Sequence, residues 1–203
     1  MSILFALLLV GTTDALRLNV PAGRSRPLCM AVSTMPLLDA ISEAGVVGCD
    51  ATEEQQAKVE RLASELAGTG YDSAQAKVPL SGTYELLYSM SKGGSSGKVG
   101  PLVGKVTQII VDETGFINQV ELFGGALTIQ LHAKREVIDD DRIRVSFVET
   151  VFMLFGIELK RSPAKGQGVW EQVYVERGLD GSAQLRVMRT PSLFVLRQKA
   201  AAQ

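Results

Sequence analysis

From residue 81 to residue 197, the chain consists of short runs in which apolar and polar residues alternate. The clearest run, residues 127–134, reads LTIQLHAK and has an apolar residue at every second position. A period of two is typical of a β-strand with one buried face. Further strands are predicted at residues 83–89, 106–110, 116–122, 143–147, 169–176, 185–189 and 193–197. The chain is therefore predicted to fold mainly as β-sheet.

The connections between these runs are short and rich in Gly and Asp, as at residues 112–115, 124–125 and 139–141. No helix-length segment separates the strands, which disfavours parallel α/β folds. The pattern indicates an antiparallel up-and-down barrel or a sandwich of eight or nine strands. The apolar segment 151–159 is expected to be buried on both faces or to cap one end, and residues 161–167 to form a polar loop. An eight-stranded barrel is just wide enough to hold one small ligand.

Two helices are predicted within residues 31–79, ahead of the strands. The first begins at Pro36 and ends at Gly45. The second begins with the capping box TEEQ at residues 52–55, in which the Thr and Gln side chains satisfy free backbone donors. Apolar residues recur at helical spacing from Val59 to Leu66, and acidic residues dominate the polar face. We therefore expect this helix to pack on the protein and not on a membrane.

The first thirty residues are expected to be a leader and not part of the fold. Residues 3–10 form an unbroken apolar run, too short for the roughly twenty residues of a membrane span but suited to a signal peptide. A signal peptide is predicted over residues 1–15, with a buried N-terminal strand or helix as the alternative. Residues 16–30 contain three Arg and no acidic residue, which is typical of a transit peptide. Together they resemble the two-part leader of proteins sent to plastids of secondary algal origin. Residues 199–203 are expected to be a tail.

Composition excludes several functional classes. The 21 Lys and Arg residues nearly balance 22 Asp and Glu residues, so the chain lacks the basic footprint of a nucleic-acid-binding protein. Two cysteines and one histidine cannot supply the ligands of a zinc site. The glycine-rich stretch 93–98 fails the spacing of a phosphate-binding loop. Nothing in the local sequence supports Cys49 and His132 as a nucleophile pair. No catalytic or metal-binding residue is therefore assigned, and an enzyme is not expected.

Four stretches, read in order, resemble the plastid lipid-associated protein family, also called plant fibrillins. They are residues 37–41 with 51–55, residues 80–89 (LSGTYELLYS), Gln108-Ile109 with Asn118, and residues 185–189 followed by 193–196. The chain departs from the family pattern at Gln184, where the family usually has an acidic residue, and at residues 189–191. The missing carboxylate puts any polar ligand contact at that position in doubt.

The resemblance implies a lipocalin-like barrel in plastids, associated with thylakoids or plastoglobules. It also implies non-covalent binding of lipophilic molecules such as carotenoids, quinones or fatty acids, with no covalent cofactor. The prediction is thus an all-β fold with N-terminal helices (α+β). Its residues 80–198 are expected to form a lipocalin-like antiparallel β-barrel of about eight strands.

The alternation indicates which residues share a face, and thus which could line a ligand cavity. Candidate ligand-binding residues of the cavity wall are Tyr84, Leu86, Tyr88, Ile110, Val120, Leu122, Leu131, Phe147, Trp170, Arg186 and Phe194. Core packing is the alternative role for the aromatic residues. Arg186 has two interpretations: it closes the barrel floor and bonds backbone carbonyls, or it meets a ligand carboxylate or carbonyl.

Three hypotheses follow for the function. The leading one is a non-enzymatic carrier or scaffold for a lipophilic molecule at a thylakoid membrane or plastoglobule surface. The second is a subunit that docks on a thylakoid photosystem–antenna complex, with Phe152 and Phe155 in its contact surface. The third is an enzyme acting on a pigment or lipid, for which His132 and Glu149 would be the residues to test.

Overall fold

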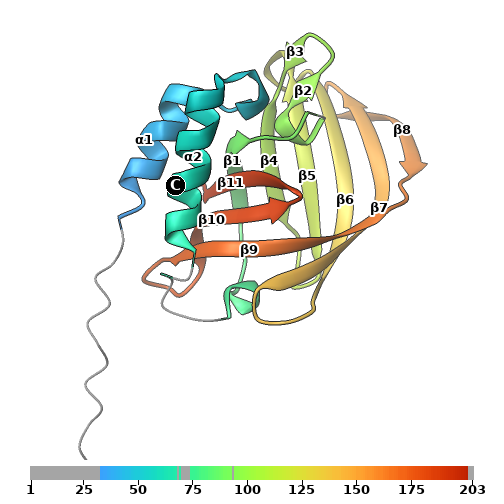
Figure 1. Ribbon diagram of the computed structural model, residues 1–203. Helices are drawn as coiled ribbons and strands as arrows, with labels where there is room; N and C mark the ends of the chain where they lie inside the picture. The colour runs from blue at the N-terminus through green and yellow to red at the C-terminus, as the bar shows by residue number, and fades with distance from the viewer. Residues whose placement is uncertain (1–32, 68, 70–73, 93, 201–203) are drawn as a thin grey trace, which may run out of the picture.

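The computed structural model describes residues 33–67, 69, 74–92 and 94–200. The leader segments predicted over residues 1–30 and most of the predicted tail lie outside these residues. The protein is mostly β, with two helices packed on one side of a large antiparallel sheet (Figure 1). None of the described helices is long and apolar enough to cross a membrane.

The main sheet has nine strands in the order β6-β5-β4-β1-β11-β10-β9-β7-β8, and an additional pairing of β6 with β7 closes it into a ring. The strands are β1 (Thr83–Ser89), β2 (Lys98–Val99), β3 (Leu102–Val103), β4 (Lys105–Ile110), β5 (Gly115–Leu122), β6 (Leu127–Val137), β7 (Arg142–Leu154), β8 (Ile157–Pro163), β9 (Gln167–Arg177), β10 (Ala183–Thr190) and β11 (Ser192–Gln198). β2 and β3 form a separate two-stranded sheet. Every predicted strand is present, because alternation with turn residues between the runs encodes an antiparallel meander.

The main sheet has nine strands, within the predicted eight or nine, because the strand beside β7 is divided into two parts. β8 pairs with residues 149–154 of β7, and β9 continues in the same direction along residues 142–146. The break falls between Pro163, which ends β8, and Gly166, whose φ of +126° favours glycine. β10 pairs with β9 only from Glu171 to Arg177, so β8 and the start of β9 have a single neighbouring strand. The ring is therefore open beside β8.

The predictions for residues 151–167 are corrected by this arrangement. Residues 151–154 belong to β7, the chain turns at Phe155-Gly156, and β8 extends to Pro163 inside the predicted polar loop. Val151 is buried, but Phe155, Ile157 and Leu159 are exposed. The apolar run forms part of the β7–β8 hairpin, and the tip of this hairpin is exposed. The run is therefore neither buried on both faces nor a cap on one end of the ring.

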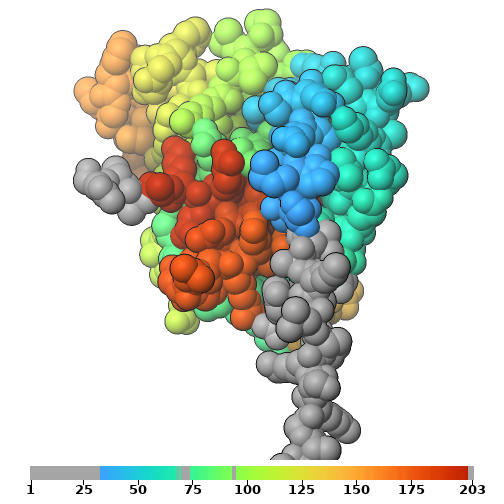
Figure 2. Space-filling view, turned by 90° about the vertical axis from the view of Figure 1, so that its left-hand side faces the viewer, coloured from blue at the N-terminus to red at the C-terminus, as the bar shows by residue number. Residues whose placement is uncertain are grey.

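Helices α1 (Met35–Ala44) and α2 (Glu53–Leu66) lie side by side on the outer face of β1, β9, β10 and β11, as Figure 2 shows. The predicted capping box is confirmed, since Thr52 and Gln55 satisfy each other's backbone N–H groups at the start of α2. Val59 and Ala63 of α2 are fully buried against the sheet. Arg189 on β10 pairs with Glu60, which ties α2 to the ring.

Four single-turn 3-10 helices complete the described structure: η1 (Gly48–Asp50), η2 (Gln75–Lys77), η3 (Gly94–Ser96) and η4 (Phe123–Gly125). η2 closes one end of the ring, where the Ala76 amide donates to the Asp140 carbonyl at 2.7 Å and its side chain is buried. Phe116 and Trp170 meet above it with ring centroids 5.6 Å apart, in a core shared with Ile143. This end of the ring is filled.

Candidate functional site

The other half of the ring is hollow and holds a cavity of about 590 Å³. Pockets that bind small molecules usually measure about 300–1,000 Å³ and are lined mainly by apolar side chains. This cavity has that character. Its wall comprises Leu86, Ser95, Val99, Val106, Gln108, Asn118, Val120, Ile129, Leu131, Phe147, Thr150, Gln167, Gly168, Trp170, Met188, Thr190, Pro191, Phe194 and Leu196.

The mouth and the floor of the cavity differ in exposure. Ser95, Gln167 and Pro191 are exposed and mark the mouth, which lies where the start of β9 lacks a second neighbour. Gln108 and Met188 are buried and lie at the floor. A ligand would therefore enter beside the β10–β11 turn and reach the buried polar side chain of Gln108 at the far end.

The floor contains a network of polar side chains centred on Arg186. The guanidinium donates to the Gln108 Oε1 at 2.6 Å and, through Nη2, to the Gln172 Oε1 at 3.2 Å. Gln108 in turn donates from Nε2 to the Asn118 Oδ1 at 3.0 Å. Strand β4 supplies Gln108 and strand β5 supplies Asn118, which are directly paired residues. The network therefore joins the buried cation to the cavity wall.

Arg186 is 1% exposed and is held by neutral groups. Its carbon Cζ lies 5.4 Å from the centre of the Tyr84 ring, and among the described residues no carboxylate pairs with it. Burial lowers the pKa of Arg186 to about 10, which still leaves it charged at neutral pH. Burying a charge without a counter-ion costs free energy of folding, so such a charge usually has a structural or functional role. The predicted backbone-carbonyl partners are replaced by two side-chain amides.

Six of the predicted wall residues do lie on the cavity: Leu86, Val120, Leu131, Phe147, Trp170 and Phe194. Tyr84 and Ile110 instead lie in the filled core beneath the floor, where the Tyr84 hydroxyl donates to the Ala183 carbonyl at 2.8 Å. Leu122 packs beside Gly104. Arg186 lies behind Gln108 and does not form part of the wall.

Tyr88 is on the opposite side of the sheet, so the prediction that it shares a face with Tyr84 is wrong. A β-bulge between Leu86 and Tyr88 shifts the register against β11. A one-residue shift moves every following side chain to the other face. Tyr88 is therefore buried under α1 and α2 and not in the ring. The same reversal explains why Leu86 lines the cavity and Tyr88 does not.

Several cavity residues were missed by the sequence prediction. Val106, Ile129, Met188 and Leu196 each belong to a predicted run and share its inner face. Extending the alternation along each strand would have found them. Gln108 and Thr150 are polar residues on that inner face, so an alternation rule that places only apolar residues inside cannot identify them.

A second hollow lies outside the filled end of the ring and has a volume of about 830 Å³. Charged and polar residues make up most of its lining, and three of its cations have partners: Lys77 pairs with Asp140, and Arg144 pairs with Glu136. Arg135 donates to the Glu113 carbonyl at 2.9 Å. Although larger, this hollow has a mainly charged and polar lining, so the mainly apolar cavity inside the ring is the better candidate site.

Of the residues considered for catalysis, His132 and Glu149 lie in contact with each other. His132 lies on the outer face of β6, with Nδ1 3.4 Å from Glu149. Glu149 and Glu158 both bind Arg161, and this lowers the pKa of Glu158. Cys49 lies in η1 and contacts Asp50. Within the part of the chain that the structure describes, no three His, Cys, Asp or Glu side chains gather as metal ligands.

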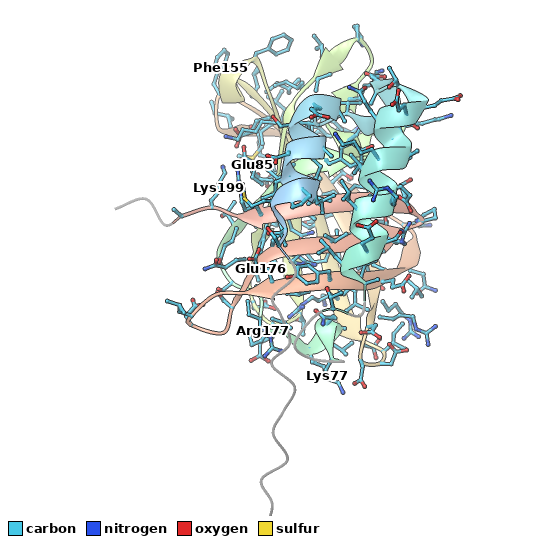
Figure 3. All side chains as sticks on the ribbon, turned by 60° about the vertical axis from the view of Figure 1, so that its left-hand side comes forward. Lys77, Glu85, Phe155, Glu176, Arg177 and Lys199 are labelled. Atoms are coloured by element: carbon cyan, nitrogen blue, oxygen red, sulfur yellow. The ribbon has the colours of Figure 1, made fainter. Side chains whose placement is uncertain are left out.

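Apolar side chains stand exposed at the end of the ring that carries the β7–β8 turn. Phe155 is 77% exposed at that turn and Phe123 is 68% exposed in η4, next to it. The Phe155 amide donates to the Ala126 carbonyl at 2.7 Å, which holds the two turns together. Figure 3 shows Phe155 at the end of the molecule opposite Lys77. Together with Ile157, these two phenylalanines are called the turn patch below.

Both phenylalanines of the turn patch have a left-handed backbone, with φ of 52° at Phe123 and 49° at Phe155. This conformation costs a bulky residue about 1 kcal/mol or more relative to glycine. Phe152, predicted beside Phe155 as a contact residue, is only partly exposed because its partner on β6 is Ile129, a cavity residue.

Comparison with known proteins gives one finding. The profile of the family described as PAP_fibrillin matches residues 33–196, which include both helices and all but the end of the last strand. Comparison with curated proteins and with solved structures gives no match.

Proposed function

This chain belongs to the PAP_fibrillin family of plastid lipid-associated proteins, and from that premise we propose that it binds a lipophilic molecule inside its ring. The observation that carries the proposal is the apolar cavity of about 590 Å³, open at one side. The proposed role is non-enzymatic: the protein holds or escorts a carotenoid, quinone or fatty acid at a thylakoid or plastoglobule surface. The lipocalin-like interpretation of the ring is part of this proposal.

The driving force would be the removal of the ligand's apolar surface from water. At about 25 cal/mol per Å², each 100 Å² or so of buried apolar surface contributes roughly 2.5 kcal/mol before ordering costs. The wall supplies aliphatic and aromatic groups, including Trp170 and Phe194. The filled end of the ring prevents a ligand from passing through. The cavity is therefore suited to holding one molecule, inserted from the mouth.

The proposal is tested by purifying the chain from its native membrane and analysing a solvent extract by mass spectrometry. We expect a lipophilic compound in roughly stoichiometric amount. Leu131→Trp, which fills the cavity, should lose the compound. Gln130→Trp, on the outer face of the same strand, should keep it. Repeated empty extracts from the wild-type chain would contradict the proposal.

A second candidate function, docking on a lipid surface or a thylakoid pigment–protein complex, is favoured by the turn patch. Strained aromatic residues held in solvent at two adjacent turns are unusual in a surface with no partner. Docking and ligand binding are compatible, since the patch lies on the ring and not across the cavity mouth.

Docking is tested by flotation with thylakoid membranes and by native gel electrophoresis after mild detergent. Phe155→Asp should reduce the bound fraction several-fold. Val111→Asp is the matched control, because Val111 is 61% exposed in the turn between β4 and β5 at the opposite end of the ring. Equal binding of both variants would exclude the turn patch as the contact surface.

A further inference from the structure

The direction of the hydrogen bonds at the cavity floor restricts the chemistry of the ligand. A guanidinium has five N–H donors and no acceptor. Arg186 therefore requires the oxygen atoms of Gln108 and Gln172 to face it, as the contacts at 2.6 and 3.2 Å show. The orientation of both amides is thus determined by Arg186.

Once its oxygen faces Arg186, Gln108 can only donate from its nitrogen. That donor reaches the Asn118 Oδ1 at 3.0 Å. The Asn118 oxygen is then occupied, and the Asn118 side chain belongs to the cavity wall. Its Nδ2 group makes no hydrogen bond to another of the described residues. The relay Arg186–Gln108–Asn118 therefore ends in a free donor group at the cavity wall.

The positive charge of Arg186, where the relay begins, restricts the chemistry of the ligand further. Arg186 carries a positive charge, is 1% exposed and has no carboxylate partner among the described residues. Arg135 places a second cation near it, which disfavours the charge of Arg186 further. Beside side chains as buried as Gln108 and Arg186, an anion at the floor would be attracted strongly, because the effective dielectric is low there.

We propose that Asn118 and Gln108, oriented by Arg186, form a head-group site that takes the carboxylate of a long-chain amphiphile. This inference rests on the proposed function, since it needs a ligand in the cavity. The chain of the amphiphile would lie along Leu131, Trp170 and Phe194. Its carboxylate accepts hydrogen bonds from Asn118 Nδ2 and compensates the charge of Arg186. A hydrocarbon carotenoid would leave these donors unsatisfied.

The test measures the affinity of the full chain for three probes that share one alkyl chain: hexadecanoic acid, its methyl ester and hexadecanol. Trp170 is the only tryptophan of the chain and lies in the cavity wall, so its fluorescence reports binding directly. We expect the acid to bind about tenfold or more tightly than the alcohol, as one charge-assisted hydrogen bond predicts. The ester, a neutral acceptor, should be intermediate.

Three variants test which residues cause the preference for the acid. Asn118→Leu removes the terminal donor and should reduce the preference for the acid to about threefold or less. Arg186→Met should do the same by removing the charge; if that variant does not fold, Asn118→Leu alone decides the location. Thr150→Val is the matched control, because Thr150 also lines the cavity but lies outside the relay. It should keep the wild-type preference.

The possible outcomes separate the inference from the proposed function. Equal affinity for all three probes in the wild-type chain would overturn the head-group site and leave the apolar cavity as a ligand site. A preference that persists in Asn118→Leu would also overturn the relay. Failure of every probe to bind would count against the proposed function itself. A preference lost in Asn118→Leu and kept in Thr150→Val would support the proposal.

Discussion

Tyr84 and Tyr88 lie on one strand, yet their hydroxyl groups differ in hydrogen bonding. The Tyr84 hydroxyl donates to the Ala183 carbonyl inside the ring. The Tyr88 hydroxyl is buried under the helices and has no hydrogen-bond partner among the described residues. Gly48 lies so close to the Tyr88 ring that a Cβ at that position would overlap it. The helix side of the sheet is thus packed tightly around an unsatisfied polar atom.

The two tyrosines give a matched pair of substitutions. Tyr84→Phe should lower the free energy of unfolding by about 1–2 kcal/mol, because it leaves the buried Ala183 carbonyl without this donor. Tyr88→Phe should leave stability unchanged or raise it by about 1 kcal/mol, since the removed hydroxyl has no partner. Urea denaturation of both variants measures the difference. A loss of more than about 1 kcal/mol in Tyr88→Phe would mean that its hydroxyl is satisfied in solution.

At the residue scale, sequence alone predicted which residues share a face of a strand wherever the alternation was regular. Leu131 and Val120 were placed correctly on that basis. Tyr88 was not, because the bulge before it depends on pairing with β11, which is remote in sequence. Gln108 and Asn118 were recognised in the family resemblance but not as cavity residues, since their burial becomes favourable only when Arg186 lies beside them.

The elements with local signals were the ones that sequence predicted best. Helix α2 is an example: its capping box and apolar spacing both lie within the helix, and the structure confirms them. The division of the β7 partner into β8 and β9 was not predicted, because a break in one strand depends on the neighbouring strands. The apolar run from Val151 gave a misleading signal for the same reason, since a hairpin tip and a buried segment can share one composition.

The α2 cap provides a test at the scale of the element. Thr52→Ala should lower the free energy of unfolding by about 1 kcal/mol, because the N–H of Gln55 loses its acceptor. Thr52→Ser keeps the hydroxyl and should stay within about 0.5 kcal/mol of the wild type. Chemical denaturation followed by circular dichroism measures both. If both variants lost the same free energy of unfolding, the methyl group of Thr52, and not its capping hydroxyl, would stabilise this end of α2.

For the whole molecule, the pKa shifts predict stability that falls at the acid end of the pH scale, with opposing contributions at the alkaline end. The pKa values of Asp50, Asp112, Asp139, Glu158 and Asp180 are lowered, in each case mainly by hydrogen bonds to the carboxylate. Each depressed pKa contributes stability that is present above the ordinary values of 3.8 for Asp and 4.5 for Glu. That contribution is lost as the pH falls through the folded-state pKa.

The alkaline side follows from the tyrosines. Burial raises the pKa of Tyr84 and Tyr88 above the ordinary 10.0. The contribution of these two groups to stability is therefore present below pH 10.0 and is lost as the pH rises through the raised pKa values. Arg186 acts in the opposite direction, because its folded-state pKa is lowered to about 10.

Urea midpoints measured from about pH 3 to 11 should therefore be flat near neutrality and decline at the acid end. Tyr88→Phe removes one of the two tyrosines that lower stability at alkaline pH, so its midpoints above about pH 10 should be higher, relative to those at neutral pH, than in the wild type. The same alkaline change of midpoint in the variant and in the wild type would contradict the assignment of Tyr88 as a group with a raised pKa.

An antiparallel barrel or sandwich was predicted from the number of strands and their short connections, and a cavity was expected inside it, but the division of the interior into a filled end and a hollow end was not predicted. Bulky Phe116, Ile143 and Trp170 meet at one end, whereas Thr150 and Gly168 face the other. Which residues share a level depends on the stagger of the strands around the ring, and that stagger is a property of closure. Sequence predicts which residues share a face of a strand but not the height in the ring at which each one lies.

The opening beside β8 also has a consequence for association between copies of the protein. In the nine-stranded sheet, β8 alone has a neighbour on one side only, so a row of its amide and carbonyl groups remains available for pairing. Ile157 and Leu159 would make that edge attractive to another strand, while Lys160, Arg161 and Pro163 oppose such pairing. The strand edge beside the opening of the ring is thus also the place where two molecules could join into one continuous sheet, and the basic residues of β8 disfavour that pairing.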